Sequence, residues 1–88
     1  MTEQFDNLRA QLELLEWPNV YMFKFIAPNS PEMIARLTAM FDEGADLHFQ
    51  PSRTGKYVSV SAKELMLDTA SIMEKYYEAA KINGVIAL

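Results

Sequence analysis

The order of hydrophobic patterns in this 88-residue sequence predicts an α+β domain, in which a helix precedes a βαββαβ arrangement. Half of the residues are apolar and 23% are charged, which is typical of a single globular domain. From residue 17 onward, a strand pattern, a helix pattern, a glycine and another strand pattern occur twice. This weak repeat favours two right-handed crossovers, which place both helices on one face of an antiparallel sheet and leave the other face open.

Residues 2–16 are predicted to form an amphipathic helix. Pro18 ends it, because the residue before a proline is pushed out of the α region, and Trp17 is left at a corner where its ring packs over the domain. Spacings of 3, 4 and 3 place four apolar residues on one stripe of this helix: Phe5, Leu8, Leu12 and Leu15.

The first half of the sheet domain begins with a short run at 20–27 that is rich in aromatic and β-branched residues, which predicts a central strand. A helix follows, with Ser30 as its N-cap and Pro31 as its first residue, and it is expected to run to about Glu43. Gly44 is expected to end it in the left-handed conformation. Its predicted inner stripe is Ile34, Leu37, Thr38 and Phe41.

The second half opens on two strands joined by a hairpin. Alternation predicts a strand at 45–51, and Gly55 supplies the positive φ that the turn at 52–55 favours. A further strand is predicted at 56–63. The inward residues are expected to be Ala45, Leu47 and Phe49 on one strand and Val58, Val60 and Ala62 on the other.

The chain is expected to finish with a helix and a strand. Asp68 or Thr69 caps the helix, Gly84 closes it, and residues 85–88 form the strand. The residues expected to face inward from this helix are Ile72, Met73, Tyr76, Ala79 and Ala80. The whole order predicts a ferredoxin-like domain at 17–88, preceded by an N-terminal amphipathic helix at 1–16.

Three short motifs in this order resemble a family of small, uncharacterised bacterial proteins, the YbeD-like family. They are Trp17-Pro18 with Tyr21 to Pro28 (YMFKFIAP), Ser52 with Thr54 to Val60 (TGKYVSV), and the ending Gly84 to Leu88 (GVIAL). The resemblance covers about residues 17–88. It implies a ferredoxin-like fold similar to the ACT regulatory domains of amino-acid-metabolism enzymes, and it supplies no reaction and no catalytic residue.

Composition excludes several classes of function. The chain has no cysteine and one histidine, so it lacks a thiolate nucleophile, a disulfide and a histidine-rich metal site. We expect no catalytic residues, no metal, no cofactor and no enzymatic activity; a small enzyme is the third hypothesis, and it would need a pocket with convergent polar groups. The net charge of −4 argues against nucleic acid or an anionic membrane as the main partner. No signal peptide and no membrane span is expected, so the predicted location is cytoplasmic.

The open sheet face is the candidate site. Alternation places eight residues on it: Val20, Met22, Lys24, Ile26, Tyr57, Ser59, Ser61 and Lys63. Three of them form an apolar patch that a monomer is expected to cover, either with the N-terminal helix or with a second copy of the chain: Val20, Met22 and Ile26. The pattern therefore predicts a regulatory or protein-interaction domain, with a protein partner, self-association or a small ligand as alternatives.

RNA binding is the second hypothesis. The hairpin carries a basic patch at Arg53 and Lys56, and residues 52–63 hold three bases and no acid, net +3. Residues 2–16, with four acids and one base, are net −3. Tyr57 fits a base-stacking position of an RNA-recognition sheet, but Ser59 and Ser61 stand where further aromatic residues are typical.

Overall fold

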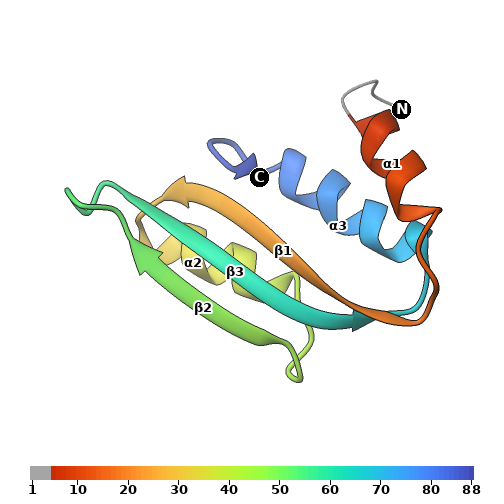
Figure 1. The fold of residues 1–88 in the computed structure, drawn as a ribbon. Helices are drawn as coiled ribbons and strands as arrows, with labels where there is room; N and C mark the ends of the chain where they lie inside the picture. Colours follow the sequence, from red (N-terminus) through yellow and green to blue (C-terminus); the bar gives the residue numbers. More distant parts are fainter. Residues whose placement is uncertain (1–4) are drawn as a thin grey trace.

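The computed structural model describes residues 5–88, and it shows the predicted ferredoxin-like arrangement (Figure 1). One antiparallel sheet has the strand order β2-β3-β1-β4. Its strands are β1 (Asn19–Pro28), β2 (Asp46–Pro51), β3 (Tyr57–Met66) and β4 (Ile86–Ala87). The helices are α1 (Asp6–Leu12), α2 (Pro31–Ala39) and α3 (Thr69–Ala80).

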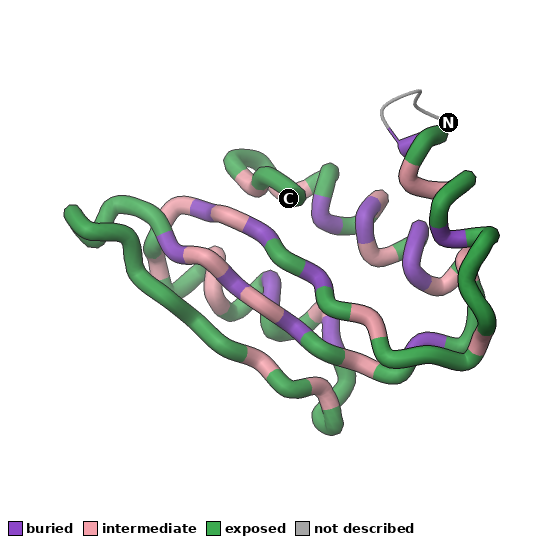
Figure 2. Tube along the Cα trace, viewed as in Figure 1, coloured by how far each residue is buried: buried purple, intermediate pink, exposed green. Residues whose placement is uncertain are grey.

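The core lies between the sheet and the helices that cover one of its faces (Figure 2). β1 and β3 pair along ten residues, so alternate side chains of both strands point to the same side. Phe23 and Phe25 are fully buried, and Tyr76 of α3 packs its ring against both. The prediction that Val58, Val60 and Ala62 face inward is confirmed, because each is at most 1% exposed.

Both ends of α2 are held by side chains. Ser30 is the N-cap, as predicted, and its hydroxyl accepts a hydrogen bond from the Met33 amide. The predicted helix end at Glu43 is wrong, because α2 ends at Ala39 with Met40 as a right-handed C-cap. Gly44 does not adopt the left-handed conformation expected for it. Among residues 5–88, positive φ occurs only at Gly55 and Gly84.

α2 stops early because side chains from distant elements form hydrogen bonds with the backbone groups that follow its last turn. Lys75 of α3 donates to the Met40 carbonyl, and the side chain of Glu64 on β3 accepts from the Asp42 amide. Phe41 then turns into the core, where it is 8% exposed. Thr38, predicted on the inner stripe, is exposed instead, and its hydroxyl donates to the Ile34 carbonyl within its own helix.

The strands also differ from their predicted bounds. β3 begins at Tyr57 and continues to Met66, beyond the predicted end at residue 63, because it pairs with β1 as far as Asn19. β4 has two residues instead of four. Phe49 was predicted to face inward but is 39% exposed, since β2 is an edge strand. Ala80 was likewise predicted inward on α3 and is exposed.

α1 does not cover the open face of the sheet. It packs against α3 on the helical side, where the Phe5 ring lies 5.8 Å from that of Tyr76 and 5.4 Å from that of Tyr77. The helix ends at Leu12, short of the predicted residue 16, because the chain tightens there and Trp17 donates its indole N–H to the Leu12 carbonyl. Leu15 is consequently 46% exposed, and residues 1–4 of the predicted helix lie outside the described residues.

Candidate interaction surface

The open face is the side of the sheet opposite the helices, and strand register arranges its residues in rows. Met22 lies between Lys63 and the unpaired edge of β1, and Asp46 completes that row on β2. The next rows are Lys24, Ser61 and His48, then Ile26, Ser59 and Gln50. All eight predicted residues occupy this face: Val20, Met22, Lys24 and Ile26 from β1, and Tyr57, Ser59, Ser61 and Lys63 from β3.

Large apolar side chains of the paired strand residues on this face fall into two groups at opposite ends of β1, and Leu88, which is 62% exposed, donates its amide to the Lys24 carbonyl between them. The first apolar group is Val20, Met22 and Leu65, which are 60%, 50% and 61% exposed. The second apolar group is Ile26, Tyr57 and Ile86. Tyr57 and Ile86 are 52% and 59% exposed. The apolar patch expected from the sequence is therefore real but divided.

Two lysines separate these groups. Lys24 stands between Met22 and Ile26 on β1, and Lys63 is its diagonal neighbour on β3. Both are exposed, and no salt bridge joins either of them to an acid within residues 5–88. The acidic residue opposite Lys63 in the register is Asp46, whose Oδ1 lies 3.1 Å from the Nε2 of His48. The centre of the open face therefore carries two ammonium groups and one carboxylate, a net positive charge.

The basic hairpin patch, Arg53 and Lys56, lies at the tip of the β2–β3 hairpin rather than on the open face (Figure 1). Gly55 has φ of +77°, as the predicted turn requires, and its carbonyl accepts a hydrogen bond from the Asn29 side chain. The hairpin is thus tied to the end of β1. Its charges extend the positive surface beyond the second apolar group.

Sequence reasoning missed Leu65 and Ile86. Leu65 follows Lys63 by two residues, so the alternation of β3 would have placed it on the open face had the strand been predicted to its full length. Ile86 belongs to a strand that was predicted, and it pairs with Ile26. The pairing partner is what assigns Ile86 to this face, and the sequence pattern does not contain it.

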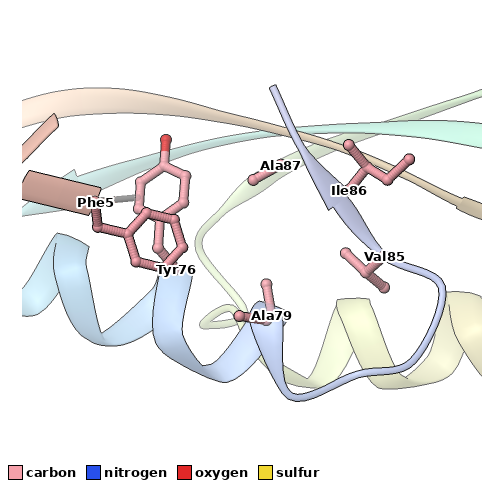
Figure 3. Close-up of a pocket in the computed structure, with 7 residues that line it drawn as sticks. Phe5, Tyr76, Ala79, Val85, Ile86 and Ala87 are labelled. Atoms are coloured by element: carbon pink, nitrogen blue, oxygen red, sulfur yellow. The ribbon is translucent and has the colours of Figure 1, made fainter. Parts of the chain in front are cut away.

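A cavity of about 370 Å³ opens on the helical side, beside β4 (Figure 3). Ala87 and Val85 lie on one side of it, and the rings of Phe5 and Tyr76 lie on the other. Burial, with a hydrogen bond to Tyr21, raises the pKa of Tyr76 above its ordinary value of 10.0, so its hydroxyl stays neutral. The lining holds no charged residue: Phe5, Tyr76, Ala79, Ala80, Val85, Ile86 and Ala87.

A second hollow, of about 210 Å³, contains an ion pair between elements. The Lys75 Nζ lies 3.8 Å from Glu64 Oε1, and these side chains are 18% and 9% exposed. That Glu64 oxygen has no hydrogen-bond partner, whereas Oε2 accepts from the Asp42 amide. Lys75 also donates to the Met40 carbonyl, so this pair joins α2, β3 and α3.

Residues 5–88 contain neither a cluster of metal-ligating side chains nor a membrane-spanning helix. Asp, Glu and His side chains do not gather there in groups of three that could hold a metal ion. None of the helices in this range has the length and apolar character needed to cross a membrane.

A family model described as "Protein of unknown function (DUF493)" matches residues 12–87. The chain belongs to this family. The match starts at the end of α1 and includes the whole sheet, α2 and α3, so the open face of this DUF493 chain lies entirely within it. No curated protein and no solved structure matches the chain.

Proposed function

We propose that this DUF493 chain is a non-enzymatic protein-interaction domain that binds a protein partner through its open face. The observation that carries the proposal is the exposure of Val20, Met22 and Leu65, each at least half accessible on a sheet face that no described element covers. Burying such side chains gives about 25 cal/mol for each Å² of apolar surface removed from water.

The size of the open face fits one protein element. Strands of ten, six, ten and two residues, at about 3.3 Å for each residue and about 4.8 Å for each strand, give a flat area of roughly 440 Å². A standard protein–protein interface buries about 800 Å² on each partner. Side chains that stand out from the sheet add accessible surface to the flat area and so make up part of the difference from a standard interface. The open face can therefore hold a single helix, or a sheet face of the same size on another domain.

The resemblance to YbeD-like proteins, and through them to ACT regulatory domains, supports a regulatory role by analogy of fold. ACT-type ligand binding at a glycine-rich loop after the first strand has no counterpart in this chain, because Pro28-Asn29-Ser30-Pro31 stands there. A protein partner therefore has more support than a small metabolite. A small ligand, if one binds, would suit the uncharged cavity beside β4 and be largely apolar.

RNA binding is the second candidate, and one observation favours it. Tyr57 is 52% exposed on the same face as Lys24 and Lys63, with the basic hairpin patch adjacent. Ser59 and Ser61 offer no further ring for stacking. A titration with single-stranded RNA tests this function, because neutralising several phosphates makes log affinity fall steeply with log salt, and absence of binding at low salt excludes it.

The proposed function is tested with two surface variants of matched chemistry. Met22→Asp places a charge within the first apolar group, whereas Leu14→Asp changes a side chain that is 85% exposed outside the open face. We expect a protein captured from cell extract by the native chain to be lost with Met22→Asp and kept with Leu14→Asp. Circular dichroism checks that both variants fold. Equal capture by both variants would contradict the proposal.

Sedimentation of the native chain at several concentrations tests self-association through the same face. A dimer that Met22→Asp dissociates and Leu14→Asp does not would make a second copy the protein partner. A monomer at every concentration leaves an external protein as the partner.

A further inference from the structure

We propose that the partner element of the open face is an acidic amphipathic helix, lying along β1 and β3. This inference rests on the proposed function and names the chemistry of the partner. It follows from three features of the face: two apolar groups, the distance between them, and the positive charge between them.

The charge between the two apolar groups indicates the chemistry of the partner. Lys24 and Lys63 lie at the centre of the face with no salt bridge among residues 5–88, although Asp46 stands opposite Lys63 in the β2–β3 register. An apolar partner would bury the Lys24 ammonium group without a carboxylate beside it, which costs several kcal/mol. A partner that carries a carboxylate opposite Lys24 removes this cost and gains a charge-assisted hydrogen bond. Charge complementarity therefore favours an acidic partner.

The spacing favours a helix. Met22 and Ile26 represent the two apolar groups, and four residues of strand separate them by about 13 Å. On a helix, which rises about 1.5 Å for each residue, apolar anchors about seven residues apart lie on one face and stand about 10.5 Å apart, close to this spacing. The positions three and four residues after the first anchor share that face, so they would meet the lysines.

The sheet itself already shows this kind of packing on its other side. α3 lies along the sheet there and buries Ile72, Met73 and Tyr76 against it (Figure 1). A helix on the open face would repeat the arrangement and complete a three-layer sandwich. The contact of α3 with the sheet is apolar at its centre with the Lys75–Glu64 ion pair beside it, whereas the new layer would have a carboxylate–lysine contact at its centre.

Two synthetic helical peptides of about 15 residues test the inference. Both carry apolar anchor pairs two turns apart; one has glutamates in the intervening turn and the other has lysines. We expect the native chain to bind the glutamate peptide on the order of tenfold more tightly, as measured by fluorescence anisotropy at low salt. Lys24→Glu should reverse that preference, and Lys81→Glu should not, because it makes the same charge change at an exposed residue outside the face.

Equal binding of the two peptides, or binding of neither, would overturn the acidic helix. The proposed function has a separate test, which is whether Met22→Asp abolishes the capture of a protein from cell extract. A partner captured through Met22 whose contacting segment is neutral, basic or extended would therefore overturn this inference alone. Loss of both readouts would overturn both.

Discussion

The hydroxyl oxygens of Tyr21 and Tyr76 lie 2.8 Å apart and join β1 to α3. Tyr76 is 4% exposed, and its ring packs against Phe23 and Phe25 as well as Phe5. This hydrogen bond therefore lies where β1, α3 and the segment before α1 meet. Because folding buries the Tyr76 hydroxyl there, the protonation of that hydroxyl is coupled to folding.

The stability of the chain is expected to fall as pH rises above 10. The pKa of Tyr76 is raised in the folded chain by burial and by its hydrogen bond to Tyr21, so the unfolded chain loses this proton first. The stabilisation is fully present below the unfolded pKa and is lost as pH rises toward the folded one. Tyr76→Phe should flatten this dependence and cost about 1 kcal/mol at neutral pH. Urea unfolding between pH 7 and 11 measures it, and an unchanged alkaline slope would contradict the assignment.

At acid pH, the cap of α3 is expected to control part of the stability. The Ser71 hydroxyl and amide both donate to Asp68 Oδ1 at 2.7 Å, which lowers the pKa of Asp68 below its ordinary value of 3.8. The stabilisation is present above that value and is lost as pH falls through the folded pKa. Asp68→Asn keeps an acceptor without a charge, so thermal melts from pH 2.5 to 7 should show a weaker acid dependence, whereas Asp68→Ala should lower the melting temperature throughout.

The Glu64–Lys75 pair is expected to show strong coupling. Lys75→Met leaves the Glu64 carboxylate, which is 9% exposed, without its cation and should cost about 3 kcal/mol in the free energy of unfolding. The double variant Glu64→Gln/Lys75→Met removes both charges. Its loss in the free energy of unfolding should therefore be smaller than the summed losses of the two single variants, by about 0.5–3 kcal/mol. Denaturant unfolding of the four proteins measures the coupling. Additive single effects would show that the two groups do not interact.

Gly84 and Gly44 should respond differently to the same change. Gly84 has φ of +90°, and an added Cβ would lie 3.1 Å from the Cγ and 3.2 Å from the Cδ of Pro28. We expect Gly84→Ala to cost at least about 1 kcal/mol from the backbone strain alone. Gly44 lies in open space without positive φ, so Gly44→Ala should be neutral or slightly stabilising. Thermal denaturation compares the two, and equal losses would contradict the distinction.

The predicted features that the structure confirms are those with a local physical cause. Alternation assigned Val58 and Val60 to the core and their neighbours to the open face because a strand has a period of two. Ser30 was recognised as a cap because a side-chain oxygen before Pro31 can satisfy a free amide of the first helical turn. The same alternation placed the eight residues of the candidate surface on one face of the sheet, and their role in binding stays a prediction.

The features that were missed depend on partners distant in sequence. α2 ends at Ala39 because Lys75 and Glu64 take the polar groups that follow it, and neither residue is near it in the chain. The stripe of α1 predicted that one side is buried, but not that α3 would cover it. The separation of the apolar patch into two groups needs the register of β1 with β3 and β4.

Acidic and basic side chains are concentrated in different parts of the molecule, whose longest dimension is 38 Å. α1 and the residues just after it hold Asp6 and Glu13 with one base, Arg9, and they lie across the sheet from the hairpin that carries Arg53 and Lys56 (Figure 1). An uneven distribution of charge orients a charged partner before contact. An acidic partner would therefore meet the hairpin end first, although the chain as a whole is negatively charged.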